Sequence, residues 1–247
     1  MADIIRAELY NLKRSRGYKW LLAVDAALCV LLIVSLLLQH RVVYSGKLLF
    51  ENGFRDFLFI IICAVFAGLS IGADFSSRTI NRHIASGYER VSVLAGKTAV
   101  YFIAAVPLFS IYPIISGIAG SLIWSWGEPL TASSIAHIAL VFIMSATLNL
   151  GICGFFVFCS FLLQDAGKSI ACSIVGHLVL STMLRMIGRA VPWFGKITNL
   201  LPISLIEQVG ELSASGKGIF LALASGAVSA LFFVLAAYAV YRKAELK

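Results

Sequence analysis

The amino-acid sequence predicts an all-α integral membrane protein with six transmembrane helices. Hydrophobic residues make up 60% of its 247 residues and charged residues only 13%, and the mean hydropathy is +0.93. Soluble domains carry about 25% charged residues. The apolar runs are too long and too uniform for barrel strands, and lipid requires that backbone polar groups be paired within the segment. Helices are therefore expected.

Six apolar runs are predicted to cross the bilayer, since each is close to or above the length of about 20 residues that spanning requires. They lie at Trp20–Leu38, Phe57–Ala73, Thr98–Ile123, Ile135–Leu163, Ser169–Gly188 and Ile219–Tyr241. Pro107 and Pro113 are candidates for kinks in the third run. Gly68 and Gly72 have the small-residue spacing of close helix packing in the second. We expect one membrane domain over residues 1–247.

The Lys and Arg residues predict the orientation of the chain. With the N-terminus inside, thirteen lie on the cytoplasmic side: Arg6, Lys13, Arg14, Arg16, Lys19, Arg78, Arg82, Arg90, Lys97, Lys168, Arg242, Lys243 and Lys247. Seven lie outside: Arg41, Lys47, Arg55, Arg185, Arg189, Lys196 and Lys217. The positive-inside rule then places both termini in the cytoplasm, in a multi-pass protein of the cell membrane. The net charge of +8 fits the lipid bilayer as partner and not nucleic acid.

Two further segments lie outside the predicted spans. In residues 1–18, Ile5, Leu9 and Leu12 follow helical spacing beside basic residues. This pattern predicts a helix lying in the cytoplasmic interface, or a basic flank that only sets topology. Residues 189–218 are too polar and broken to span. They are apolar enough to lie against the outer leaflet as short re-entrant or interfacial helices.

Ionisable residues inside the predicted spans are candidate pathway-lining residues, because their burial in lipid is costly. Asp25 lies in the first span, where Lys19 or a basic residue of another helix could neutralise it. His177 lies near the middle of the fifth span, with Arg185 two turns later on a similar face. Together they could polarise a cavity. Alternatively, His177 is a neutral, hydrogen-bonded side chain and Arg185 extends outward to the interface.

Enzyme signatures are scarce, and we expect no catalytic residue, metal site or cofactor in this chain. Gly167-Lys168-Ser169 resembles the end of a phosphate-binding loop, but that loop needs a glycine where this chain has Leu162. ATP binding is therefore not expected here. The five cysteines have no zinc-type spacing, and thiols in apolar spans are typical packing residues.

A polar, basic segment over residues 74–97 separates the second and third runs and is too long for a plain connector. Ser76 or Ser77 is predicted to cap a short helix that Gly87 ends in a left-handed turn. The apolar face of this helix would hold Ile80 and Ile84, and its exposed face Arg78, Asn81 and Arg82. A capped basic helix fixed to two spans could transmit motion from a soluble partner; a solvated loop is the alternative.

With these features the chain resembles the membrane subunit of a type 2 ABC transporter, the permease class of bacterial export systems. The resemblance covers most of the chain. It rests on Ile4-Ile5-Arg6-Ala7-Glu8-Leu9-Tyr10-Asn11-Leu12-Lys13, on Asp74-Phe75-Ser76-Ser77-Arg78-Thr79-Ile80, and on Ser86-Gly87 followed by Arg90 to Lys97. Arg78 stands where that family often has glycine, and Gly87-Tyr88 replaces a turn that commonly contains proline.

The resemblance implies a permease with six spans and an N-terminal interfacial helix. Its cytoplasmic coupling helix would dock on a separate ATPase subunit that binds ATP and Mg. The contact residues would be Arg78, Thr79, Ile80, Asn81, Arg82, His83 and Ile84. Leu200 to Gln208 would belong to the outer helices. A second permease subunit, identical or similar, would complete the pathway for export of a hydrophobic or amphipathic substrate such as an antimicrobial peptide or drug.

An ion- or proton-coupled secondary transporter is the alternative function. Such a protein needs charged residues near the middle of the bilayer and usually an internal repeat. Only His177 lies clearly at that depth, and the sequence has no convincing repeat. A membrane enzyme would need a catalytic cluster, which the spans lack. These comparisons favour the ATP-driven permease.

Overall fold

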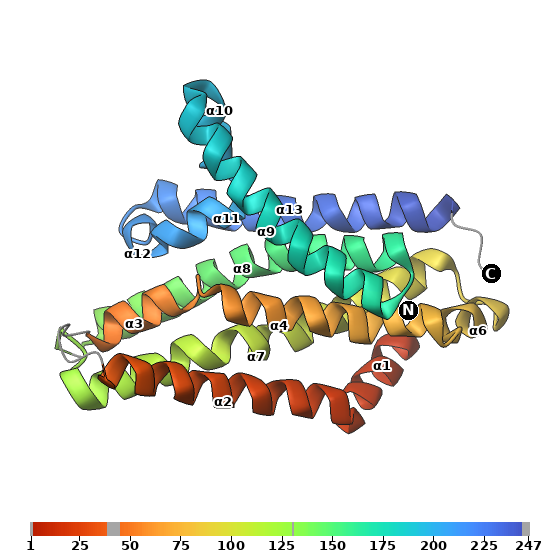
Figure 1. Ribbon diagram of the computed structural model, residues 1–247, viewed down its shortest axis with the longest axis horizontal. Helices are drawn as coiled ribbons and strands as arrows, with labels where there is room; N and C mark the ends of the chain where they lie inside the picture. The colour runs from red at the N-terminus through yellow and green to blue at the C-terminus, as the bar shows by residue number, and fades with distance from the viewer. Residues whose placement is uncertain (1, 39–44, 130, 244–247) are drawn as a thin grey trace.

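The computed structural model describes residues 2–38, 45–129 and 131–243, so Arg41 and Lys247, which were counted for orientation, lie outside it. Helices account for all regular structure in the described residues, and the longest run side by side along one axis (Figure 1). The elements are α1 Ala2–Arg14, α2 Arg16–Leu38, α3 Gly46–Gly53, α4 Phe57–Ala67, a π-helix Gly68–Gly72, α5 Ala73–Ser76, α6 Thr79–Ala85, α7 Arg90–Trp124, α8 Ala132–Leu163, α9 Ala166–Ala190, α10 Pro192–Thr198, α11 Pro202–Leu205, a 3-10 helix Ile206–Gln208, α12 Val209–Leu212 and α13 Gly216–Lys243.

The described residues include five helices that are long and apolar enough to cross a membrane: α2, α7, α8, α9 and α13. A sixth results if Ile60–Ser76 and Thr79–Ala85, which meet at a bend of 58°, count as one span. Large apolar side chains cover the outside of these helices; Leu122 is 82% exposed and Phe220 is 75% exposed. Such a surface is suited to lipid and not to water. By length and composition, the chain is a multi-pass helical membrane protein.

The second predicted span is helical throughout but changes its winding at the π-helix Gly68–Gly72. The two glycines allow the start of α9 to approach closely. A Cβ on Gly68 would lie 2.9 Å from the carbonyl oxygen of Ala166, and one on Gly72 would lie 3.0 Å from its Cα. The predicted close packing at this glycine pair is confirmed.

Helices α7 and α8 form the interior of the bundle, and α13 packs along α8. Large side chains that are almost completely buried fill the space between them, among them Tyr101, Phe156, Phe161 and Tyr241. Gly226 is a point of close approach between α8 and α13. A Cβ there would lie 2.4 Å from the carbonyl oxygen of Thr147, which belongs to the backbone and cannot move aside.

Gly226→Ala is expected to destabilise the protein by about 1–3 kcal/mol, because the methyl group must push α8 and α13 apart. Gly216→Ala is the matched control in the same helix, since nothing lies within 4 Å of a Cβ at that position. Thermal unfolding of both purified variants in detergent measures the difference. Equal unfolding temperatures would contradict the described contact between α8 and α13.

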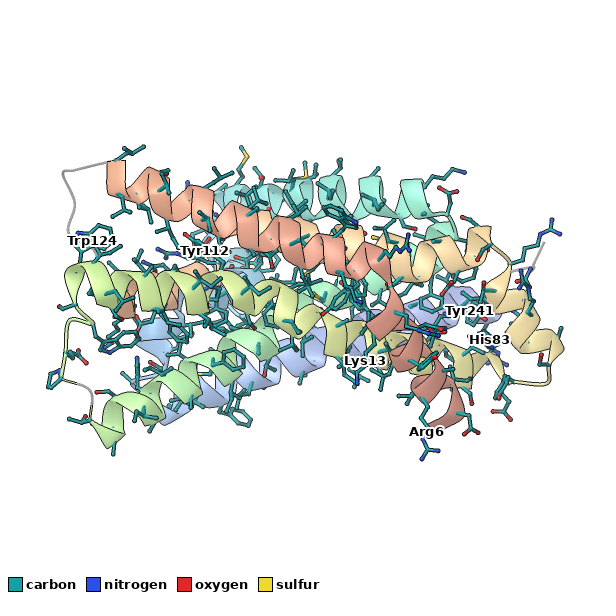
Figure 2. The ribbon with its side chains drawn as sticks, turned by 90° about the horizontal axis from the view of Figure 1, so that it is seen from below. Arg6, Lys13, His83, Tyr112, Trp124 and Tyr241 are labelled. Carbon is teal, nitrogen blue, oxygen red and sulfur yellow. The ribbon has the colours of Figure 1, made fainter. Side chains whose placement is uncertain are left out.

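The bundle has two distinct ends. Helices α1 and α6 and the C-terminal end of α13 gather at one end, called the α6 end below, whereas α3 and α12 lie at the other (Figure 1). Figure 2 shows His83 and Tyr241 at the α6 end and Trp124 at the opposite end. Of residues 189–218, which were predicted as a broken segment outside the spans, 192–212 form three short α-helices and a 3-10 turn, whereas the two ends of the segment belong to α9 and α13.

Candidate functional site

The polar segment that follows α5 forms a short helix, α6, as predicted, but the predicted serine cap is wrong. Arg78 occupies the N-cap position in the left-handed conformation (φ 57°), and no side chain caps α6. The Ser76 hydroxyl is directed back to the preceding turn, and the Ser77 hydroxyl lies 2.8 Å from the Thr79 hydroxyl, so neither accepts from a backbone N–H of α6. Ser76 donates to the Gly72 carbonyl at 3.4 Å, and Ser77 to the Asp74 carbonyl at 3.5 Å. Helix α5 includes Ser76 and has Ser77 as its C-cap, and Arg78 takes the N-cap position of α6, so neither serine caps the next helix.

Helix α6 has a buried apolar side and an exposed basic side. Ile80 is fully buried and Ile84 is half-buried, whereas Arg78 and Arg82 are exposed. Asn81, which was predicted to be exposed, is instead half-buried. Gly87 follows the helix with φ 89°, which confirms the predicted left-handed turn.

Replacing Ile80 with alanine is expected to cost about 2–4 kcal/mol, because the cavity left under α6 lies in a packed interior. Ile84→Ala, at the half-buried position one turn later, should cost clearly less. The unfolding temperatures of the two purified variants make the comparison. A larger effect at Ile84 than at Ile80 would contradict the described orientation of α6.

A buried lysine of α7 connects α5, which precedes α6, to the N-terminal helix α1. The ammonium of Lys97, whose side chain is 2% exposed, lies 2.7 Å from a carboxylate oxygen of Glu8 and also pairs with Asp74. Nε2 of His83 is 4.0 Å from the same Glu8 oxygen. We call Glu8, Asp74, His83 and Lys97 the Lys97 cluster. It joins α1, α5, α6 and α7 at one point.

Close packing holds α1 against α7 beside this cluster. A Cβ on Gly96 would lie 2.8 Å from Cγ2 of Ile4, so the glycine lets the buried Ile4 side chain approach the helix. Burying an ammonium is costly unless acceptors surround it, and the two carboxylates supply them. The sequence identified Lys97 as part of the basic segment but not its partners, which lie 89 and 23 residues away.

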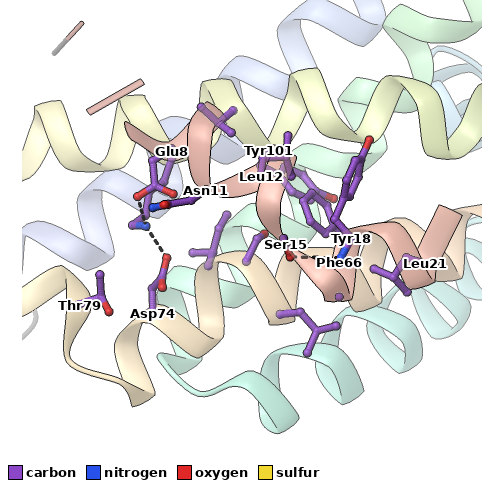
Figure 3. A pocket seen from close by; sticks show the side chains of 16 residues that line it. Glu8, Asn11, Leu12, Ser15, Tyr18, Leu21, Phe66, Asp74, Thr79 and Tyr101 are labelled. Carbon is purple, nitrogen blue, oxygen red and sulfur yellow. Dashed lines mark hydrogen bonds and ion pairs between the residues drawn. The ribbon is translucent and has the colours of Figure 1, made fainter. Parts of the chain in front are cut away.

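A cavity of about 350 Å³ lies between the α1–α2 junction, the π-helix and α7 (Figure 3). Figure 3 shows the Glu8 and Asp74 carboxylates on its wall, joined by dashed lines to the ammonium between them. Phe66 forms the apolar side together with two tyrosines. Its ring centroid is 5.1 Å from that of Tyr18 and 5.6 Å from that of Tyr101.

Asp25 is fully buried, and neither of its carboxylate oxygens has a hydrogen-bond partner among the described residues. Lys19 is exposed, and none of the ion pairs in the described part of the chain involves Asp25. The predicted neutralising pair is therefore not found there. Asp25 lies on the side of α2 that faces the interior of the bundle, whereas Trp20 and Val24 of the same helix are exposed.

His177 and Arg185 have different surroundings. His177 is buried, its ring lies 5.8 Å from that of Phe156, and it lines a small apolar pocket of about 100 Å³. Arg185 is half exposed and forms an ion pair of 2.7 Å with Glu207. His177 therefore lines the apolar pocket, whereas Arg185 does not.

No model of a known protein family matches the chain, and a comparison with curated proteins finds no match either. The functional conclusion therefore depends on the geometry of the α6 end. There, the exposed Arg78 and Arg82, the Lys97 cluster and the adjoining cavity lie close together, although their residues are dispersed between Glu8 and Tyr101.

Proposed function

We propose that this chain is the membrane-spanning permease subunit of an ATP-driven exporter of the type 2 ABC class. In this proposal the α6 end faces the cytosol, α1 lies in the membrane interface, and Phe57–Ala73 is the second of six spans. Residues 192–212 form the outer-face helices. A partner ATPase binds ATP and Mg, and a second permease subunit, identical or similar, completes the pathway.

Helix α6 is the observation that supports this proposal most strongly. Its buried Ile80 fixes it to the bundle, while Arg78 and Arg82 are exposed at the tip. A loop serving only as a connector needs no such helix. A short helix with one anchored side and one basic side is suited to dock on a soluble partner that carries acidic groups.

The connections of α6 provide a route for motion into the membrane. Force on α6 reaches the second span through the bend of 58° at Arg78. It also reaches α1 and α7 through the Lys97 cluster. If two conformations of the ATPase bind two states of the paired permeases with different affinity, ATP hydrolysis can drive the exchange between them.

The backbone at Arg78 also agrees with the resemblance noted from the sequence. That family often has glycine at this position, and Arg78 adopts the left-handed conformation that glycine favours, with φ 57°. The chain thus keeps the same kind of turn with a basic side chain added at the tip. The largely apolar spans favour a hydrophobic or amphipathic substrate.

Purification from the native host tests the proposal. The full chain, tagged at its C-terminus and extracted in mild detergent, is expected to bring with it a subunit containing a phosphate-binding loop, and the complex should hydrolyse ATP. Substrate export by vesicles that contain this chain and no ATPase would contradict the proposal.

Asp25 favours a second candidate, an ion- or proton-coupled secondary transporter. A buried carboxylate without a partner among the described residues must be neutralised by a proton or a bound cation in a membrane interior. For this candidate, Asp25→Asn should abolish transport driven by a proton or sodium gradient in vesicles without ATP. Transport that depends on ATP and survives this substitution would exclude it.

A further inference from the structure

The cavity beside the Lys97 cluster has a composition that coupling to an ATPase does not require. Its charged side chains, Glu8, Asp74 and Lys97, form a polar wall, and aromatic and aliphatic side chains form the opposite one; the lining also includes the polar residues Asn11, Ser15, Ser70 and Thr79. With a volume of about 350 Å³, it falls in the range of small-molecule sites. It lies where α1 turns into α2, so both the membrane interface and the hydrocarbon region would adjoin it in the proposed orientation.

The polar wall has an excess of negative charge. Two carboxylates share one ammonium, which binds Oε1 of Glu8 and Oδ2 of Asp74. The second oxygen of each carboxylate has no hydrogen bond among the described contacts. The side chains of Glu8 and Asp74 are 17% and 26% exposed, whereas that of Lys97 is 2% exposed. A ligand in the cavity therefore meets acceptor oxygens more readily than the ammonium.

The apolar wall complements a cation in a different way. The hydroxyl groups of Tyr18 and Tyr101 donate to the carbonyl oxygens of Ala104 and Cys63, each at 3.0 Å. These hydroxyls are thus already committed to the backbone, and their rings join Phe66 in the cavity wall. Aromatic faces attract cations. Leu21 and Leu69 extend the same wall with aliphatic surface.

We infer that this cavity is a binding site for a cationic amphiphile that carries a protonated amine and an alkyl chain. The ammonium donates hydrogen bonds to the open oxygens of Glu8 and Asp74, and the chain lies along Phe66, Leu21 and Leu69. An anionic head group would meet both carboxylates and is disfavoured. This inference needs no ATPase, so its test is independent of the proposed function.

Binding of dodecylamine to the full chain in phosphatidylcholine nanodiscs tests the inference, with native mass spectrometry as the readout. Dodecanol and dodecanoate have the same chain with a neutral or an anionic head. We expect one saturable amine site and binding of the other two that is weaker by about tenfold or more. Nanodiscs containing phosphatidylethanolamine distinguish the sources of the amine. Loss of dodecylamine binding there identifies a lipid head group as the occupant, and retained binding identifies a free amine.

Three cavity variants and one control separate charge recognition from simple partitioning. Glu8→Gln and Asp74→Asn should each weaken amine binding by about tenfold. Asn11→Asp, which adds a carboxylate at an exposed position in the cavity lining, should strengthen it without removing any cluster residue. Asp3→Asn changes the charge of α1 equally outside the cavity and should have no effect. Equal binding of dodecylamine and dodecanol, or an amine affinity unchanged in all three cavity variants, would overturn the inference.

Discussion

Lys97→Met is expected to destabilise the protein by about 3–5 kcal/mol, the largest effect of any single substitution proposed for this chain. Methionine keeps the length of the side chain but removes the ammonium that two carboxylates share. Glu8 and Asp74 would then face each other in a poorly solvated place with their charges uncompensated. Because the cluster joins four elements, its loss should also release α1 and α6 from the bundle.

Removing the carboxylates together with the ammonium should restore most of this stability. The triple variant Lys97→Met, Glu8→Gln and Asp74→Asn has no uncompensated charge at the cluster and is expected to unfold close to the temperature of the wild type. The unfolding temperatures of the wild type, the single variant and the triple variant are compared in detergent, with size-exclusion chromatography as the readout of the folded fraction. A single variant as stable as the wild type, or a triple variant less stable than the single one, would contradict the described cluster.

Arg78→Glu combined with Arg82→Glu is expected to lower recovery of the proposed partner ATPase with the tagged chain by about tenfold or more. Both side chains are exposed on α6, so the substitutions reverse the charge of the proposed docking surface without emptying the interior. The unfolding temperature of the chain should therefore remain near that of the wild type. ATP-driven export should fall in parallel with complex formation.

The matched control reverses two charges far from α6, where α9 leads into α10 and projects from the bundle (Figure 1). Arg189 and Lys196 are exposed there, at the end of α9 and in α10. Replacing both with Glu changes the net charge equally and should leave ATPase recovery unchanged. If this control loses the ATPase as fully as the α6 variant, general electrostatics and not α6 governs the association.

The helices of the bundle could be predicted from the sequence because apolar runs of this length have few alternatives. The predicted Ile135–Leu163 corresponds to α8, Ala132–Leu163, and Ser169–Gly188 to α9, Ala166–Ala190. The third helix begins eight residues before the predicted Thr98, at Arg90. Hydropathy predicts only the part of a helix that lipid can cover. The backbone hydrogen bonds of α7 continue into the polar residues before that part, so the helix begins earlier.

The arrangement at the α6 end could be predicted only in part. The buried side of α6 at Ile80 and the turn at Gly87 follow from local spacing and glycine chemistry. The serine cap was wrong because Ser76 belongs to the preceding helix. The partners of Lys97 depend on which helices meet in space, and no local pattern encodes their distance along the chain. The burial of Asp25 without a partner among the described residues could not be predicted either, because it depends on how α2 packs against the other helices.

Cross-linking in the native host tests the proposed contact between α6 and an ATPase most directly. A photoreactive amino acid placed at Arg82 is expected to form a covalent product with the ATP-binding subunit, identified by mass spectrometry. The same amino acid at Trp193, which is exposed in α10 far from α6 (Figure 1), should form none. An ATPase product from Trp193 but not from Arg82, in cells that export normally, would contradict the account.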